Sequence, residues 1–313
     1  MHVLITGGHG LIGSGVNQRL LAAGHEVTVV DRARPGVLGR GPSRAEGYRL
    51  IEEEYRLIEA DILDVDVWGE VLDDVDAVVH TAGIHQVDEV ANDAVRHIDV
   101  NVTGTYKLLT AANARGVGRF IYLSSAKVYG HGAGVASAES DLVAPVESYA
   151  LGKVVAEHYC AHFARELGMD TCSIRPFSVY GPGQDTHTGY IGALLESLRL
   201  GHRAVLSGDP DFVRDFVHID TVVDLCVSAA ISEKTPPLIL NAGSGEATTL
   251  GLLVKAFETV TNQPLNVTFR VPRPGTLRFT LADTQQMRDF SWPHMHDLEQ
   301  GILETVTAEL SSR

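Results

Sequence analysis

The chain has 313 residues and a mass of 33.7 kDa, enough for one large domain or two coupled ones with a sizeable core. Its formal net charge of −15 argues against a general nucleic-acid or acidic-membrane surface, where basic stripes are expected. No apolar stretch approaches the roughly 20 residues that span a bilayer, and no signal peptide is recognisable. Three well-separated cysteines form neither a disulfide framework nor a CxxC motif, so we expect a reducing cytoplasm.

An apolar run followed by a glycine-rich turn opens the chain. Residues 3–6 are almost continuously apolar, which is typical of a buried parallel strand. Gly7, Gly10 and Gly13 follow, and a helical pattern extends over 11–23. Glycines let backbone N–H groups and the N-terminus of a helix approach a pyrophosphate closely. The sequence therefore predicts a dinucleotide site at this turn.

A carboxylate ends the second predicted strand, which covers 27–30. Asp31 can accept hydrogen bonds from a ribose diol and would repel a 2′-phosphate, which favours NAD over NADP. Arg32 and Arg34 follow at once and would suit a 2′-phosphate, so NADP remains the alternative.

Short apolar segments alternate with helical patterns in the next part of the chain. The strands are predicted at 57–60, 77–80, 120–123 and 171–174, and the most distinct helices at 101–114 and 149–167. This alternation implies right-handed crossovers and a parallel sheet with helices on both faces. We therefore expect an α/β fold, a Rossmann-like doubly wound parallel sheet.

The alternation of strand and helix patterns ends after Arg175, and Gly and Pro cluster at 181–183. We expect a smaller C-terminal substrate-binding lobe over the carboxyl edge of the sheet, where ligands bind in such folds. The expected division is a dinucleotide-binding domain over residues 1–177, with 213–244 returning to it, and a substrate-binding lobe over 178–212 and 245–313.

Tyr149 and Lys153 lie one turn apart in a predicted helix, with Cβ atoms roughly 5–6 Å apart on one face. A nearby ammonium and a positively charged nicotinamide ring both favour phenolate, so we expect the pKa of Tyr149 to fall from about 10 toward neutrality. Tyr149 would then act as general base, Lys153 would hold the cofactor ribose, and Ser125 would hydrogen-bond the substrate oxygen, in preference to Ser124. For the pair alone, an amphipathic core Tyr and a solvated Lys would be the simpler interpretation.

These segments together resemble the extended short-chain dehydrogenase/reductase family, especially its NAD-dependent nucleotide-sugar epimerase and dehydratase branch, over nearly the whole chain. The similar segments are 6–13, 61–62, 79–83, 101–105, 124–130, 149–153, 175–183, 214–220, 241–246 and 273–275. The resemblance implies catalysis by Ser125, Tyr149 and Lys153. It implies cofactor contacts from Gly7, Gly10, Leu11, Ile12, Asp31, Asp61, Ile62, Thr81, Ala82, Gly83, Asn101, Tyr149 and Lys153.

The resemblance also implies a substrate site made by Ser125, Lys127, Ser178, Arg214 and Arg273. The two arginines fall where the family binds the phosphates of a nucleotide sugar. Without the resemblance, both would be interpreted as ordinary surface or interface ion pairs.

Four positions depart from the family pattern. Ser178 replaces a common Asn, Thr276 a frequent Asp, and Gly83 a frequent Ala. Lys127 stands where dehydratases and decarboxylases tend to carry Glu, so elimination or decarboxylation by the usual route is not expected. If Lys127 faces the site, its charge would suit a sugar carboxylate; the alternative is a solvent-facing lysine.

The first functional hypothesis is an NAD-dependent nucleotide-sugar epimerase, in which NAD removes a hydride and returns it to the other face. The second is an NAD(P)-dependent dehydrogenase or reductase of a sugar, sugar acid or other small alcohol. A third is a cofactor-binding protein without catalysis, which the retained Tyr–Lys pair disfavours.

Metal binding is not expected, because His294 and His296 have no acidic or Cys neighbours at ligand spacing in the sequence. His187 is a candidate for assisting proton transfer. Family resemblance suggests a homodimer built on helices near 92–114 and 149–167. Its apolar seam would comprise Val95, Ile98, Val102, Val154 and Val155, which would otherwise pack against the sheet.

Overall fold

The protein structure is a computed structural model that describes residues 1–32, 55–85, 93–132, 134–272, 275–291 and 293–311. Two residues named above, Arg34 and Arg273, lie outside the described residues.

In the described part of the chain, seven parallel strands form the central sheet, in the order β11-β6-β5-β4-β1-β2-β3. They are β1 (His2–Thr6), β2 (Glu26–Asp31), β3 (Arg56–Glu59), β4 (Ala77–His80), β5 (Arg119–Leu123), β6 (Asp170–Pro176) and β11 (Ile239–Ala242). The register aligns Thr6 at the end of β1 with Val30 on β2 and His80 on β4. The strand order reverses at β1 and β4, and ligands of such sheets bind at the carboxyl ends beside this point.

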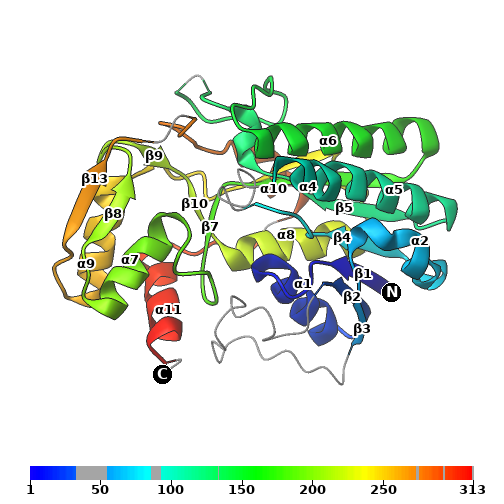
Figure 1. Ribbon diagram of the computed structural model, residues 1–313, viewed down its shortest axis with the longest axis horizontal. Helices are drawn as coiled ribbons and strands as arrows, with labels where there is room; N and C mark the ends of the chain where they lie inside the picture. Colours follow the sequence, from blue (N-terminus) through cyan, green and yellow to red (C-terminus); the bar gives the residue numbers. More distant parts are fainter. Residues whose placement is uncertain (33–54, 86–92, 133, 273–274, 292, 312–313) are drawn as a thin grey trace.

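Helices cover both faces of the sheet (Figure 1). One face carries α1 (Leu11–Ala22) and α8 (Ile219–Ile231), and the other carries α4 (Ala94–Ile98), α5 (Thr105–Ala114) and α6 (Ser148–Leu167). Because side chains alternate along a strand, Val3 and Ile5 join the apolar cluster beneath α1 and α8, whereas Leu4 joins the cluster beneath α5 and α6. Both clusters are almost free of solvent, so the sheet is a rigid base for the residues at its edge.

Short helical segments connect these layers. They are η1 (Ile62–Asp64), α2 (Val65–Trp68), η2 (Gly69–Asp74), the π-helix η3 (Asp99–Gly104) and η4 (Ala126–Tyr129). The π-helix η3 joins α4 to α5 without a break and carries Asn101.

The C-terminal elements gather at one end of the sheet, on the left of Figure 1, around an apolar cluster of their own. They are β7 (Ser178–Tyr180), α7 (Gly189–Leu200), β8 (Ala204–Ser207), β9 (Val213–Arg214), β10 (Phe216–His218), β12 (Thr248–Thr249), α9 (Leu250–Thr261), β13 (Val267–Arg270) and α11 (Leu298–Ser311). Three two-stranded sheets, β10-β7, β12-β9 and β13-β8, form within this part. The helix α10 (Gln285–Phe290) contacts β11 of the large sheet instead.

The expected α/β fold is confirmed. The predicted strand at 77–80 coincides with β4, and the helix predicted at 149–167 is α6, one residue longer. The helix predicted over 101–114 differs locally, because its first turn is the π-helix η3. All three cysteines are free and buried. Within the described residues, no helix combines the length and the apolar character needed to cross a bilayer.

Candidate active site

The glycine-rich turn leaves β1 at its carboxyl end and is packed directly against the end of β4. A Cβ atom on Gly7 would lie 2.7 Å from the Ala82 Cα atom, and Gly7 has a φ of 72°, so a larger residue fits poorly on both counts. A Cβ atom on Gly13 would lie only 2.3 Å from the Gly7 carbonyl oxygen. Because Gly10 at the N-cap of α1 has no side chain, the first-turn N–H groups, including those of Leu11 and Ile12, are left for a ligand. The turn therefore has the form that a pyrophosphate requires.

Two carboxylates lie at the carboxyl ends of β2 and β3, on the same edge of the sheet as this turn. The Asp31 Oδ2 atom at the end of β2 accepts the backbone N–H of His9 at 3.0 Å, which fixes the carboxylate next to the turn. Asp61 caps η1 by accepting the Leu63 N–H at 3.0 Å, and its other oxygen lies 3.0 Å from the Arg96 guanidinium. Both positions suit contacts to the adenosine half of a dinucleotide.

The segment after β4 is held by hydrogen bonds to its neighbours. The Thr81 hydroxyl donates to the Thr6 carbonyl at 2.8 Å. The Asn101 side chain exchanges two 2.8 Å hydrogen bonds with the backbone of Ile84. A Cβ atom on Gly83 would lie only 3.1 Å from the Asn101 Oδ1 atom, so the two residues are closely packed. Asn101 therefore fixes the segment that continues from β4, beside the end of the strand where the cofactor is expected.

Ser125, Tyr149 and Lys153 meet at the carboxyl end of β5. Ser125 is the N-cap of η4 and lies within hydrogen-bonding reach of Tyr149. The Lys153 Nζ atom donates to the Leu123 carbonyl at 2.6 Å and lies 5.7 Å from the centre of the Tyr149 ring. The three predicted catalytic side chains are thus neighbours, whereas Ser124 is engaged elsewhere, donating to Glu157 at 2.5 Å.

The protonation of this group differs from the sequence-based expectation. Burial raises the pKa of Tyr149 to about 12, the Ser125 hydrogen bond opposes this increase, and the Glu147 carboxylate adds to it. Burial also lowers the pKa of Lys153 to about 8, with Glu157 acting in the opposite direction. In the protein without a cofactor, burial therefore keeps Tyr149 as a phenol. The charge of an oxidised nicotinamide, which was part of the expected decrease, is the contribution that would favour the phenolate.

Lys127 lies on the same side of the site as Tyr149. Its Nζ atom is 5.7 Å from the Tyr149 ring centre and forms a 2.8 Å ion pair with the Glu147 Oε2 atom, with 41% of the Lys127 side chain exposed. Lys127 therefore faces the site, but with a carboxylate already beside it.

Two of the candidate substrate residues, Ser178 and Arg214, lie in the described part of the C-terminal elements. Ser178 begins β7, and its N–H donates to the Asp215 carbonyl at 2.9 Å. The Arg214 guanidinium is buried and donates to neutral oxygens only, including the Tyr190 hydroxyl at 3.1 Å and the Leu277 carbonyl. Burial lowers the pKa of Arg214, and no described carboxylate lies within ion-pair distance of it. A buried cation with neutral partners is suited to an anion. Arg273 lies outside the described residues, and His187 is an exposed residue paired with Glu196 at 3.1 Å.

A buried ion pair beneath the site escaped the sequence analysis. The Arg175 Nε and NH2 groups donate to both oxygens of Glu157 at 2.9 and 2.7 Å, and both side chains are almost fully buried. Glu157 lies one helical turn beyond Lys153 on α6, and this spacing was the one signal in the sequence that could have placed a carboxylate near the catalytic lysine. His97 was also missed: its ring is buried 6.1 Å from that of Tyr149, and both nitrogens lack a hydrogen-bond partner among the described residues.

A Rossmann sheet with a glycine-rich turn at β1 and a Ser–Tyr–Lys group beyond β5 defines a dinucleotide-dependent enzyme of the short-chain dehydrogenase/reductase class. The profile of the NAD dependent epimerase/dehydratase family matches residues 3–243, and the chain belongs to this family.

Known relatives cover the whole chain. It is 33% identical over 313 residues to a UDP-glucose 4-epimerase of Mycolicibacterium smegmatis, with 98% of this chain and 97% of the relative aligned. A solved UDP-N-acetylglucosamine 4-epimerase from Methanobrevibacter ruminantium, in complex with UDP-N-acetylmuramic acid, is 27% identical, with a TM-score of 0.90 over 100% of this chain and 99% of the other. The UDP-glucuronic acid 4-epimerase from Bacillus cereus, in complex with UDP-glucuronic acid and NAD, is 25% identical, with a TM-score of 0.90 over 100% of both chains.

Proposed function

We propose that this protein is an NAD-dependent epimerase that inverts C4 of a UDP-linked sugar. Full-length similarity to 4-epimerases of UDP-sugars supports the reaction, and a neighbour that contains both NAD and a UDP-sugar supports the ligands. The observation that carries the proposal is the meeting of Ser125, Tyr149 and Lys153 at the carboxyl edge of the sheet that also carries the glycine-rich turn, because hydride transfer needs a proton acceptor next to the cofactor.

The proposed mechanism assigns one task to each side chain. With a bound oxidised nicotinamide, whose positive charge would favour the phenolate, Tyr149 takes the proton of the sugar 4-hydroxyl while the C4 hydride leaves, which gives a 4-keto sugar. Ser125 hydrogen-bonds the same oxygen, and Lys153 holds the cofactor ribose and adds positive charge beside Tyr149. NAD supplies the hydride acceptor and, after the sugar turns over, the donor. Tyr149 then returns its proton to the oxygen, so the protein and cofactor end unchanged.

Incubation of the purified protein with NAD and UDP-, GDP- or dTDP-sugars tests this function. We expect a new stereoisomer of a UDP-sugar by chromatography and NMR, without accumulation of absorbance at 340 nm. Stoichiometric formation of NADH would instead identify the dehydrogenase alternative, and absence of both would contradict the proposal.

Substitution of Arg214 by Met is expected to raise the KM for the nucleotide sugar by about 10-fold to 100-fold and to change kcat little, since a charge-assisted phosphate contact contributes roughly 1.5–3 kcal/mol. Steady-state kinetics measure KM and kcat separately. Arg214→Lys is the matched control and should recover part of the loss, because it retains the charge but not the forked geometry. A fall in kcat alone would argue against phosphate binding.

The pH dependence should respond in opposite directions to the two members of the Lys127–Glu147 pair. The Glu147 carboxylate raises the pKa of Tyr149, so Glu147→Gln should lower that pKa and move the acid limb of the kcat–pH profile to lower pH. Lys127→Met leaves the carboxylate without its 2.8 Å partner and should move the limb to higher pH. The double variant should lie near the wild type; shifts in the same direction for both single variants would contradict this charge model.

The same Lys127→Met variant tests recognition of a sugar carboxylate. A specific loss on UDP-glucuronic acid, with activity on UDP-glucose retained, is the result that carboxylate recognition requires. Equal losses on both sugars would eliminate that hypothesis.

We also propose the division into a dinucleotide-binding domain, 1–177 with 213–244, and a substrate-binding lobe, 178–212 with 245–313. The contacts of α8 with β4 and β5, the place of β11 in the large sheet and the separate apolar cluster of the C-terminal elements support it. The strands β9 and β10, at 213–218, pair with β12 and β7 of the lobe, so the support for the return begins at α8. A cytoplasmic location is proposed because the three cysteines are unpaired and buried.

A homodimer through α4, α5 and α6 is proposed on the basis of exposed apolar side chains. Val95 is 70% exposed and Ile98 is 50% exposed, as a seam requires, whereas Val154 belongs to the core and is removed from the seam. Ile98→Glu is expected to shift a dimer to a monomer in analytical ultracentrifugation. An unchanged mass would contradict this interface, and exposed Leu252→Glu on α9 is the matched control.

A further inference from the structure

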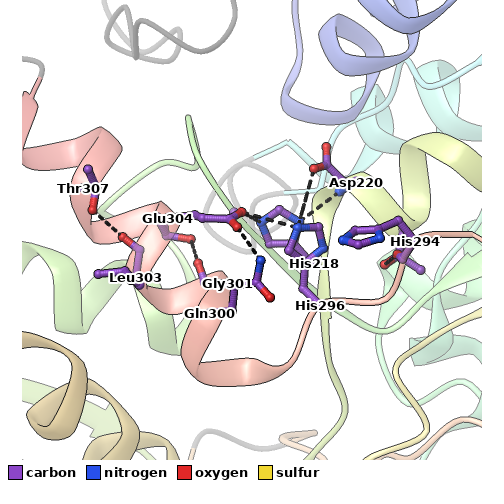
Figure 2. Close-up of polar contacts among 12 residues, drawn as sticks. His218, Asp220, His294, His296, Gln300, Gly301, Leu303, Glu304 and Thr307 are labelled. Carbon is purple, nitrogen blue, oxygen red and sulfur yellow. Dashed lines mark hydrogen bonds and ion pairs between the residues drawn. The ribbon is translucent and has the colours of Figure 1, made fainter.

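Two histidines and two carboxylates meet away from the Tyr149 site, where β10, α8 and α11 come together (Figure 2). His218 ends β10, Asp220 lies in the first turn of α8, His296 precedes α11, and Glu304 lies within α11. We propose that this cluster binds one divalent transition-metal ion, such as Zn²⁺, that fastens α11 to the start of α8.

The distances are close to those of a metal site. One ligand atom from each of His218, Asp220 and His296 lies within 4.8 Å of the others. The Asp220 Oδ2 atom is 3.7 Å from the His218 Nδ1 atom and 3.9 Å from the His296 Nε2 atom. Ligand atoms around tetrahedral zinc, with bonds of about 2.0–2.1 Å, lie roughly 3.3–3.5 Å apart. Small side-chain rotations would therefore close the site.

Glu304 supplies the fourth group. Its Oε2 atom is 3.4 Å from the His296 Nε2 atom and 3.7 Å from the His218 Nε2 atom. The backbone N–H of Asp220 points to the His218 Nδ1 atom at 3.3 Å, which keeps the lone pair on Nδ1 and the proton on Nε2. Metal binding at Nδ1 would replace this long hydrogen bond, retain the tautomer and turn Nε2–H toward Glu304, an arrangement in which a carboxylate orients a metal-bound imidazole.

The cluster leaves a buried imidazole unsatisfied, and the ring rotation that metal binding at Nδ1 requires would bring its Nε2–H to Glu304. The His218 side chain is only 1% exposed, and its Nε2 atom lacks a hydrogen-bond partner among the described residues. The outward oxygens of both carboxylates are held by other groups: Asp220 Oδ1 by the Arg19 guanidinium at 3.2 Å, and Glu304 Oε1 by the Gln300 amide at 3.1 Å. The inward oxygens face the two imidazoles. The positive charge of Arg19 would weaken metal binding, but the two carboxylates together carry a larger negative charge.

Sequence spacing could not reveal this group. His294 and His296 have no acidic neighbour at ligand spacing along the chain, which was the reason for expecting no metal. The fold brings Asp220 and Glu304 to His296 from two other elements, and leaves His294 outside the group although its ring contacts that of His296 at 4.4 Å.

Titration of the untagged, chelator-treated full-length chain with Zn²⁺ alone tests the proposal. We expect one equivalent to bind by calorimetry and the melting temperature to rise by about 5 °C when free Zn²⁺ is 100-fold above Kd. His296→Gln should weaken binding by at least about 10-fold and Glu304→Gln by about 10-fold to 100-fold, and at the same free Zn²⁺ both should reduce the thermal shift to about half or less. Co²⁺ should give the visible absorption of a tetrahedral site in the wild type only.

His294→Gln is the matched control, since its exposed ring belongs to the same HxH pair but not to the cluster; its Zn²⁺ affinity should stay within about 2-fold. The less buried His296 and Glu304 are preferred to His218, whose replacement threatens folding. No binding, binding unchanged in His296→Gln, or an equal loss in His294→Gln would each overturn the proposal.

Discussion

Tyr149→Phe is expected to lower kcat for epimerisation by about 10²-fold to 10⁴-fold, the range that a positioned general acid or base contributes. The substitution removes the oxygen that takes and returns the proton and leaves the ring in place between Ser125 and Lys153. Because the hydroxyl accounts for little of the buried surface, stability and NAD affinity should change little. Steady-state kinetics, together with fluorescence titration of NAD, measure the two effects separately.

Ser125→Ala is the matched comparison. It removes a hydrogen bond to the reacting oxygen but not the base, so the loss should be smaller than for Tyr149→Phe. Full turnover of Tyr149→Phe on a genuine substrate would disprove the assigned role. Equal losses of activity and of NAD binding would place Tyr149 in cofactor binding instead.

Much of the fold follows from local patterns in the sequence. Apolar runs such as 77–80 are too short for a helix and too continuous for a half-exposed strand, which leaves a buried parallel strand. The Gly7–Gly13 turn was equally predictable, because glycines at this spacing between a strand and a helix are typical of a dinucleotide-binding turn. The structure gives the reason for glycine: atoms of Ala82 and the Gly7 carbonyl occupy the space that side chains would need. The π-helix at 99–104 was not, because nothing in residue periodicity separates it from the α-helix that continues it.

The parts of the site that sequence could not supply depend on contacts between distant segments. Burial raises the pKa of Tyr149, and burial has no signature in local spacing. Lys127 could be placed beside the catalytic Ser125, but its ion pair with Glu147 depends on the path of the chain between them. The His218–His296 contact joins β10 to the segment before α11 and likewise required the fold.

Replacement of Glu157 by Gln is expected to destabilise the protein by about 3–5 kcal/mol, because it leaves the buried guanidinium of Arg175 without a compensating charge. The loss should also reach the active site. Glu157 raises the pKa of Lys153, so without this charge the pKa should fall further below about 8, and Lys153 would lose its proton near neutral pH. Denaturant unfolding measures the first effect, and the pH dependence of kcat measures the second.

Two control variants distinguish the effect of an unpaired buried charge from the loss of an ordinary surface ion pair and from a change in packing. Asp66→Asn removes the partner of Lys107 in an exposed 3.3 Å pair and should cost at most about 1 kcal/mol. The double variant Glu157→Leu with Arg175→Met removes both buried charges and should recover most of the stability lost in Glu157→Gln. It should not recover the altered pH profile, because Lys153 still lacks the carboxylate. A double variant as unstable as the single one would show that packing, rather than the unpaired charge, sets the cost.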